Sequence, residues 1–192
     1  MAKLTFYFDP RCPFAWGTSL WARSVQAQGA ITIDWKLFSL HEQNRDQDLP
    51  RPESPAADAA LRALWLARKE AGQAGIDRLY LALGKARHDR NEDLSDHKTL
   101  QQAVLDAELG ADLLDRALSD DAVNAAVLAE HQDSVDRLAA FGVPWLVLDD
   151  RDFGFFGPVI KDLPDPKEAL DLWEHTSWFL GQRNFYELKR PR

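Results

Sequence analysis

The sequence has 192 residues, of which 45% are hydrophobic and 28% charged, and its formal net charge is −8. An acidic chain lacks the basic surface that binding to nucleic acid or to an anionic membrane requires, so we expect neither partner. Its length fits one domain with an insertion better than two independent domains.

The N-terminal residues give no sign of secretion. Met1–Lys3 lead directly into an apolar strand, without the long apolar region of a secretory signal, and no apolar run is long enough to span a membrane. Cys12 is the single cysteine, which excludes a disulfide within the chain. These features together predict a reducing, cytoplasmic location.

A βαβ unit is predicted at the N-terminus. The aromatic run Leu4–Phe8 fits a buried strand, and Ile31–Phe38 fits a second strand rich in β-branched residues. Between them, apolar residues recur at helical spacing from Trp16 to Val25, and Gly29 ends the helix. A crossover of this length implies that the two strands pair in parallel.

Cys12 lies where the first strand meets the helix. Pro13 suits the first helical position, which makes Cys12 the N-cap residue. The sulfur then faces unpaired amides and the positive end of the helix dipole, which favour a thiol pKa below the free value of about 8.5. A buried structural cysteine is the alternative. The position between Asp9-Pro10-Arg11 and a helix-starting proline favours a reactive thiol, and we predict Cys12 as the nucleophile.

The middle of the chain predicts a helical insertion. A polar loop follows His41, and Ser54 with Pro55 resembles a helix start. Apolar residues at helical spacing predict a series of helices, the last capped by Ser119 or Asp120. These helices are expected around 61–68, 76–89, 100–107, 109–118 and 123–141.

A ββα unit closes the chain. Phe141–Leu148 and Phe153–Phe156 fit a hairpin, and Asp165 followed by Pro166 fits the N-cap and first position of a final helix. The order βαβ, helices, ββα predicts an α/β, thioredoxin-like fold with an α-helical insertion. We assign 1–40 and 140–192 to the thioredoxin-like domain and 54–139 to the insertion.

Five segments form a recognisable set of motifs: Phe8–Trp16, Asn44–Asp46, Leu79–Tyr80 through Arg87–His88, Phe155–Pro158 and Tyr186–Arg190. Together they resemble the DsbA-like thioredoxin-fold family, and within it the actinobacterial mycothiol-dependent nitroreductases. This resemblance implies that Cys12 is the attacking thiol, that Pro144 is a cis-proline facing it, and that mycothiol rather than glutathione is the thiol cosubstrate.

One residue departs from that pattern. The nitroreductases have a second cysteine three residues after the first, where this chain has Ala15. A single nucleophile also resembles the kappa-class glutathione transferases and the 2-hydroxychromene-2-carboxylate isomerases, which use glutathione. Three functions therefore stay open. The first is a thiol-dependent oxidoreductase or transferase acting on a disulfide or small electrophile. The others are a glutathione-type enzyme in which Cys12 only positions a bound thiol, and a non-catalytic binding protein.

The remaining candidates for thiol or substrate binding surround these landmarks. Val143 would offer backbone groups to a peptide-like thiol, although Pro144 could simply begin an edge strand. His88 fits either a pocket residue or a histidine at a helix end. The other candidates are Pro13, Phe14, Trp16 and Trp145, which adjoin the landmarks, and Asn44 and Arg45, which either reach the cosubstrate or lie in a solvated loop.

The other histidines do not predict a metal site. His131 falls on the apolar stripe of its helix and is expected in the core, while His41, His97 and His175 have no spacing typical of metal ligands. We therefore expect no metal. The sequence leaves open whether two chains form a homodimer.

Overall fold

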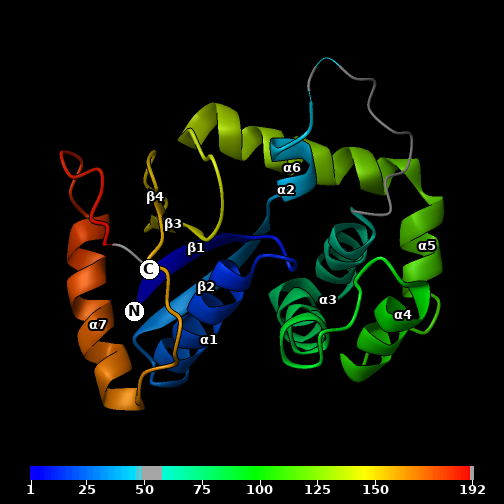
Figure 1. The fold of residues 1–192 in the computed structure, drawn as a ribbon, viewed down its shortest axis with the longest axis horizontal. Helices are drawn as coiled ribbons and strands as arrows, with labels where there is room; N and C mark the ends of the chain where they lie inside the picture. Colours follow the sequence, from blue (N-terminus) through cyan, green and yellow to red (C-terminus); the bar gives the residue numbers. More distant parts are fainter. Residues whose placement is uncertain (47, 49–57, 191–192) are drawn as a thin grey trace.

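A four-stranded mixed sheet organises the structure, a computed structural model that describes residues 1–46, 48 and 58–190 (Figure 1). Strand β1 (Ala2–Phe8) pairs in parallel with β2 (Ile31–Leu37) and antiparallel with β3 (Trp145–Leu148), which in turn pairs with β4 (Phe155–Phe156). The order β2-β1-β3-β4 leaves β2 and β4 at the two edges. This topology confirms the predicted thioredoxin-like α/β fold.

Two helices belong to the same half of the molecule as the sheet. Helix α1 (Pro13–Ala27) connects β1 to β2, and α7 (Pro166–Leu180) follows β4. The two helices pack against each other, because the Trp21 indole N–H donates to the Ala169 carbonyl oxygen at 3.1 Å and the Trp21 ring contacts that of Trp173.

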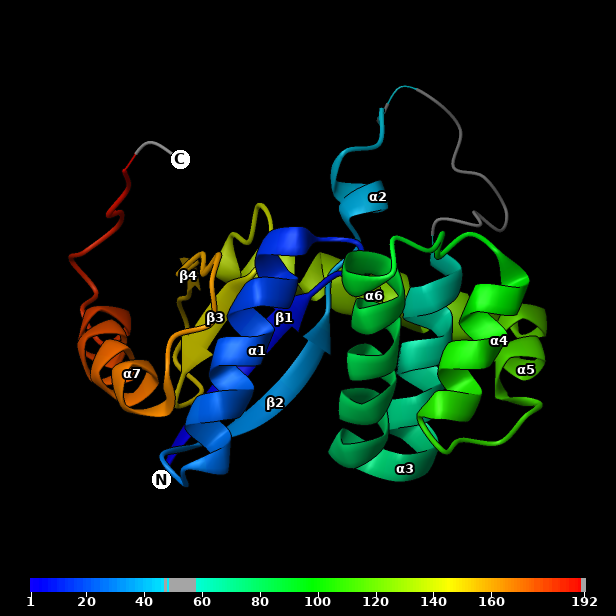
Figure 2. The same ribbon diagram turned by 60° about the horizontal axis from the view of Figure 1, so that its bottom comes forward.

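The insertion lies beside β2, and its last helix returns toward the sheet (Figures 1 and 2). Its elements are α3 (Ala59–Gly84), the π-helical turn η2 (Lys85–Asp89), α4 (His97–Asp106), α5 (Leu113–Ser119) and α6 (Asp121–Leu138). The short helix α2 (Leu40–Gln43) precedes them. The assignment of 1–40 and 140–192 to one domain and of 54–139 to the insertion stays a prediction.

The hydrophobic core runs from the sheet into the insertion without a break. Phe6 and Phe8 of β1 are fully buried, and their ring centroids lie 5.0 and 5.7 Å from that of Trp35 on β2. Tyr80 of α3 stacks on Phe8 with ring centroids 3.7 Å apart and meets Trp35 edge-on. The aromatic residues that predicted the strands therefore also hold the insertion against the sheet.

The free edge of β2 is closed by side chains of neighbouring helices. The outward N–H of Trp35 donates to Oε1 of Gln73 at 2.8 Å, and that of Leu37 donates to Oε1 of Glu130 at 3.0 Å. Arg68 donates to the Trp35 carbonyl oxygen and forms an ion pair with Glu130. An edge strand otherwise exposes unpaired backbone groups. Side chains of the insertion therefore form the hydrogen bonds with β2 that a neighbouring strand would form.

Local backbone signals explain where the helices differ from expectation. The break predicted between 61–68 and 76–89 is a kink inside α3, at Gly72, whose φ of 64° favours glycine. Helix α6 begins at Asp121, because the Asp120 side chain accepts from the Ala122 N–H, and it ends at Leu138 rather than at 141. The backbone of Ala139 turns left-handed there.

Other boundaries were also predicted wrongly. Residues 40–43 form α2, where a loop was expected, because the Ser39 hydroxyl caps the Glu42 N–H. Helix α5 is shorter than the predicted 109–118, and β3 begins only at Trp145. The helix start expected at Ser54 and Pro55 lies outside the described residues.

We predict that Gln73→Met destabilises the protein by about 1–3 kcal/mol, because it leaves the Trp35 N–H without its acceptor. Urea unfolding would measure the loss. Gln132→Met is the matched control: the Gln132 amide bonds Asp136 on the exposed face of α6, so its loss should stay within about 0.5 kcal/mol. Equal effects of the two substitutions would contradict the role assigned to the β2 edge.

Candidate active site

Cys12 caps the N-terminus of α1, as the sequence predicts. Its Sγ accepts from the Ala15 N–H at 3.4 Å and donates to the Val143 carbonyl oxygen at 3.3 Å. The side chain is 5% exposed. The helix terminus favours a thiolate, whereas the contact with the Val143 oxygen requires the protonated thiol. The two neighbours thus favour opposite protonation states of the same sulfur.

The carboxylate of Asp9 holds the loop that carries Cys12. One oxygen accepts from the Arg11 N–H at 2.8 Å and the other from the Leu40 N–H at 2.9 Å, while the Asp9 carbonyl oxygen accepts from the Cys12 N–H. Burial raises the pKa of this carboxyl, and the two backbone N–H groups act in the opposite direction. Asp9 therefore joins the end of β1, the start of α1 and the start of α2.

His88 contacts the same loop from the insertion. Its Nε2 lies 2.9 Å from the Pro10 carbonyl oxygen, which can only accept, so Nε2 carries the proton and Nδ1 is an acceptor. The ring stacks on Trp16 with centroids 5.8 Å apart. A Cβ on Gly84 would lie 2.1 Å from the Trp16 ring, so this contact between α1 and α3 requires glycine. The π-helical turn places His88 over the indole.

The segment before β3 forms the opposite wall of the site. The Val143–Pro144 peptide bond is cis, the geometry that the sequence analysis expected, and a second cis bond precedes Pro158. The Gly157 N–H donates to the Pro144 carbonyl oxygen at 2.9 Å. Residues 143–144 and 157 thus lie together, and the Val143 oxygen of this segment contacts the Cys12 sulfur.

Of the aromatic and proline residues predicted to bind thiol or substrate, those of α1 lie next to Cys12 or one turn beyond it, whereas Trp145 packs against Phe141. Pro13 and Phe14 are exposed next to Cys12, and Trp16 lies one turn further along α1. Trp145 is buried under the exposed ring of Phe141.

The loop candidates Asn44 and Arg45 form local contacts at the end of α2. The Asn44 amide donates to the Leu40 carbonyl oxygen, and the Arg45 guanidinium binds the Glu42 carboxylate. Their proposed role toward a cosubstrate stays a prediction.

Comparison with known proteins identifies the family. A family model described as "Rv2466c-like: Mycothiol-dependent nitroreductase Rv2466c" matches residues 11–190. The chain belongs to this family. The predicted thiol-dependent enzyme class is therefore confirmed. A Mycobacterium tuberculosis relative named "Uncharacterized protein Rv2286c" is 35% identical over 194 residues, covering all of this chain and 83% of that protein.

Solved structures share the fold of this Rv2466c-like chain. A probable DsbA oxidoreductase, SCO1869 from Streptomyces coelicolor, has a TM-score of 0.66 at 18% identity and covers 98% of this chain and 94% of its own. A 2-hydroxychromene-2-carboxylate isomerase scores 0.64 at 14% identity, covering 92% and 95%. The cytosolic disulfide reductase DsbM from Pseudomonas aeruginosa, solved with GSH, scores 0.61 at 15% identity, covering 92% and 99%.

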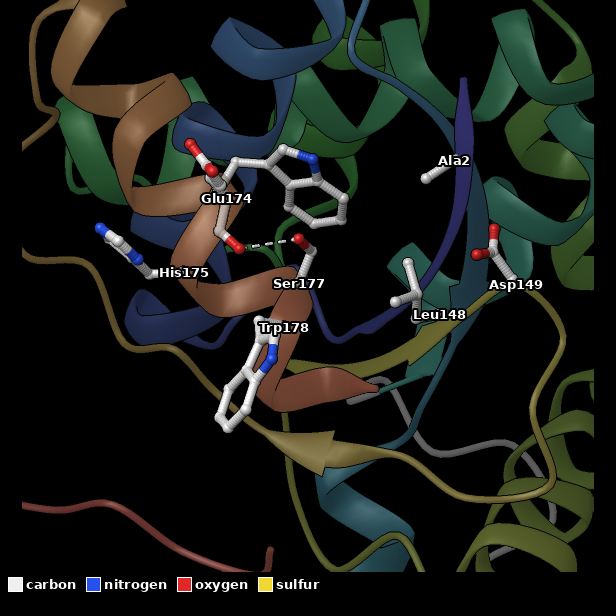
Figure 3. A pocket seen from close by; sticks show the side chains of 8 residues that line it. Ala2, Leu148, Asp149, Glu174, His175, Ser177 and Trp178 are labelled. Carbon is white, nitrogen blue, oxygen red and sulfur yellow. Dashed lines mark hydrogen bonds between the residues drawn. The ribbon is translucent and has the colours of Figure 1, made fainter. Parts of the chain in front are cut away.

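A cavity of about 470 Å³ lies away from this site, between α7 and the ends of β1 and β3 (Figure 3). Ala2, which begins β1, and Asp149, which follows β3, lie on one side of it, with Ser177 and Trp178 of α7 on the other. Trp173 also lines the cavity. Cys12 follows the opposite end of β1, about 20 Å along a seven-residue strand. The cavity is therefore separate from the thiol.

Two further findings concern the described residues as a whole. They contain no group of three or more His, Cys, Asp or Glu side chains placed to hold a metal ion. None of their helices is both long and apolar enough to cross a membrane. His131 is buried against Phe38, as expected from its place on the apolar stripe.

Sequence reasoning missed three contributors to the site. Asp9 belongs to the motif Phe8–Trp16, but no role was predicted for it. An acidic residue directly after a buried strand often accepts hydrogen bonds from the backbone of the following loop, so its role could have been predicted. Gly84 and Phe141 gave no local signal. Their roles depend on Trp16 and on Phe156, residues more than ten positions away along the chain.

We predict that His88 makes stability depend on pH. Burial lowers the pKa of His88 from 6.5, and the bond to the Pro10 carbonyl oxygen offsets this in part. Because the folded-state pKa is depressed, the stabilisation is present above about pH 6.5 and is lost as the pH falls through the folded pKa. His88→Asn keeps an amide donor but cannot titrate. The free-energy difference between wild type and His88→Asn, from urea unfolding at pH 7.5 to 5, should shift in favour of the variant as the pH falls. A difference that does not change with pH would refute this.

Proposed function

We propose that the chain is a cytoplasmic reductase in which the Cys12 thiolate attacks a disulfide or small electrophile and mycothiol regenerates it. The observation that carries this proposal is the position of the Cys12 sulfur, which caps α1 and accepts from the Ala15 N–H. Helix N-termini lower thiol pKa values and create nucleophilic cysteines. The cytoplasm is proposed because a lone reactive thiol persists in a reducing compartment.

The geometry supports a simple course for the reaction. The thiol first loses its proton to solvent, which breaks the hydrogen bond to the Val143 oxygen. The negative sulfur still accepts from the Ala15 N–H at the helix terminus. With a disulfide substrate, the thiolate then bonds one sulfur and expels the other as a thiolate. One mixed disulfide and one free small thiol result.

Regeneration must come from outside the chain. Ala15 occupies the position of a resolving cysteine and is fully buried, so a second small thiol has to attack the mixed disulfide. This attack returns the Cys12 thiolate and joins the small thiol to the half of the substrate that Cys12 held. The cycle up to this point is a thiol–disulfide exchange, and attack by one more small thiol on this product releases the second substrate thiol and completes the two-electron reduction.

Mycothiol is proposed as that small thiol because the family is described by its mycothiol dependence. Glutathione is the competing cosubstrate, since DsbM was solved with GSH, although that likeness in itself shows the fold alone. The same description names a nitroreductase, so we also propose a nitro compound as the substrate that is reduced.

We predict that incubation with the disulfide of mycothiol adds one mycothiol mass to Cys12, and that the disulfide of glutathione adds its own mass at least about tenfold more slowly. Cys12→Ser should abolish both the adduct and the thiol-dependent reduction, with a loss of at least about 10²-fold. Intact-protein mass spectrometry and a reduction assay measure these outcomes.

The matched control is Cys12→Ser combined with Ser119→Cys, which keeps one thiol but moves it to the exposed end of α5. It should stay inactive. Turnover by this control or by Cys12→Ser would refute a catalytic Cys12, and absence of an adduct on the wild type would favour an enzyme in which Cys12 only positions a thiol.

A second prediction concerns Ala15. Ala15→Cys restores a pair of cysteines across the first turn of α1, so the new thiol can attack the Cys12 mixed disulfide from within. Release of the small thiol should then be nearly independent of thiol concentration, while in the natural protein it should rise with that concentration. Stopped-flow kinetics and a mass two hydrogens lower test this. Equal concentration dependence in both proteins, with no internal disulfide, would contradict the account.

A further inference from the structure

An exposed aromatic surface adjoins the Cys12 site. Phe141 is 63% and Phe156 38% exposed, and their rings stack with centroids 5.6 Å apart. Phe141 lies two residues before Val143, whose carbonyl oxygen receives the Cys12 thiol. We call Phe141 and Phe156 the aromatic shelf. Stacked rings left open to solvent beside a reactive thiol indicate a surface that something covers.

The C-terminal segment is anchored close to this shelf. The Phe185 ring packs on Phe155 and Phe179, with centroids 5.8 and 4.7 Å away. Arg183 forms an ion pair with Asp152 at 2.5 Å. Phe155 is the neighbour of Phe156 on β4, so the anchor and the shelf lie on opposite sides of the same short strand.

Beyond Phe185 the segment loses contact with the fold. Tyr186 is 85% and Leu188 80% exposed. Within the described part of the chain, 186–190 form no hydrogen bond, ion pair or ring contact. In Figure 2 this tail rises past the sheet at the end of the molecule where α1 begins.

The reach of the tail is set by its anchor at Phe185. Three extended residues separate Leu188 from Phe185 and span about 10 Å, and the Phe185 ring lies 5.8 Å from that of Phe155, the neighbour of Phe156. Among the described residues, β4 is an edge strand of two residues with no further strand outside it. Tyr186 and Leu188 alternate with charged Glu187 and Lys189, so an extended tail can turn both apolar side chains to one surface.

We propose that residues 186–190 form a strap that folds around the edge of β4 and docks Tyr186 and Leu188 on the aromatic shelf, covering the approach to Cys12. The tether favours this occupant over a second copy, since a short flexible link gives an effective concentration in the millimolar range. The functional consequence rests on the proposed role of Cys12. The docked strap shields the Cys12 mixed disulfide and restricts access to small thiols.

Cross-linking tests the docking without using Cys12 chemistry. In a Cys12→Ser background, Arg190→Cys, which shares the face of Tyr186 and Leu188 in an extended tail, is paired with Ala139→Cys, an exposed position two residues before Phe141 that leaves the shelf intact. Oxidation by copper phenanthroline removes two hydrogens as the disulfide forms. We expect an intramolecular disulfide at least about tenfold faster than in the control pair Arg190→Cys with Trp178→Cys. Trp178 is 62% exposed and adjoins Phe179, which also anchors the tail, so chance encounters are equally available there.

Adding Tyr186→Ser and Leu188→Ser to the first pair should slow its cross-linking about tenfold, because these side chains supply the docking. Equal rates for the shelf and control pairs would overturn the proposal. A disulfide formed only between chains would also overturn it and assign the shelf to a second copy.

The shielding is tested separately by alkylation of Cys12 with iodoacetamide. Tyr186→Ser with Leu188→Ser should raise the rate about threefold, and Phe141→Ser added to them should raise it little further, because both remove the same contact. Strictly additive effects, or no effect of the tail substitutions, would overturn the shielding. Failure of Cys12 to support turnover would refute the proposed function and leave the cross-linking result unchanged.

Discussion

The buried carboxylate of Asp9 is the interaction on which the site depends. It accepts backbone N–H groups from the start of α1 and from α2, and its own carbonyl oxygen accepts from Cys12. Removing the side chain would leave these two N–H groups without their acceptors, and each unsatisfied buried donor costs about 1–3 kcal/mol. Burial raises the pKa of Asp9, whereas the two backbone N–H groups and the Arg11 charge lower it. The position of the Cys12 sulfur therefore depends on a side chain placed three residues earlier.

The insertion constrains the site from the other side. Gln73 and Glu130 of the insertion accept hydrogen bonds from the backbone of β2. His88 of the insertion stacks on Trp16 and bonds the Pro10 carbonyl oxygen. The first contact depends on the kink of α3 at Gly72, next to Gln73. The second depends on Gly84, because a side chain there would clash with the Trp16 ring. The same helix thus stabilises the sheet and fixes one wall of the site, so the insertion is part of the site's architecture.

Short-range signals were enough for the fold and for the position of Cys12 at the helix N-cap. Pro13 marks Cys12 as the N-cap because proline suits only the first turn, and the alternation in Ile31–Phe38 sets the strand whatever the surroundings. The rest depends on contacts distant in sequence. The sequence around Gly84 does not indicate that the Trp16 ring leaves no room for a side chain there. The sequence around Asn44 and Arg45 does not indicate that their side chains bind residues of α2.

The contact between Cys12 and Val143 links ligand binding to ionisation. The resting thiol donates to the Val143 carbonyl oxygen, so losing the proton frees that oxygen and places it beside a negative sulfur. A ligand amide N–H that donated to the same oxygen would compete with the thiol proton and screen the sulfur from the carbonyl dipole. Binding of such a ligand would therefore lower the cost of forming the thiolate, and by reciprocity the thiolate would bind that ligand more tightly than the thiol. On our proposal, a thiol cosubstrate with a peptide-like portion supplies such an N–H, and a simple alkyl thiol does not.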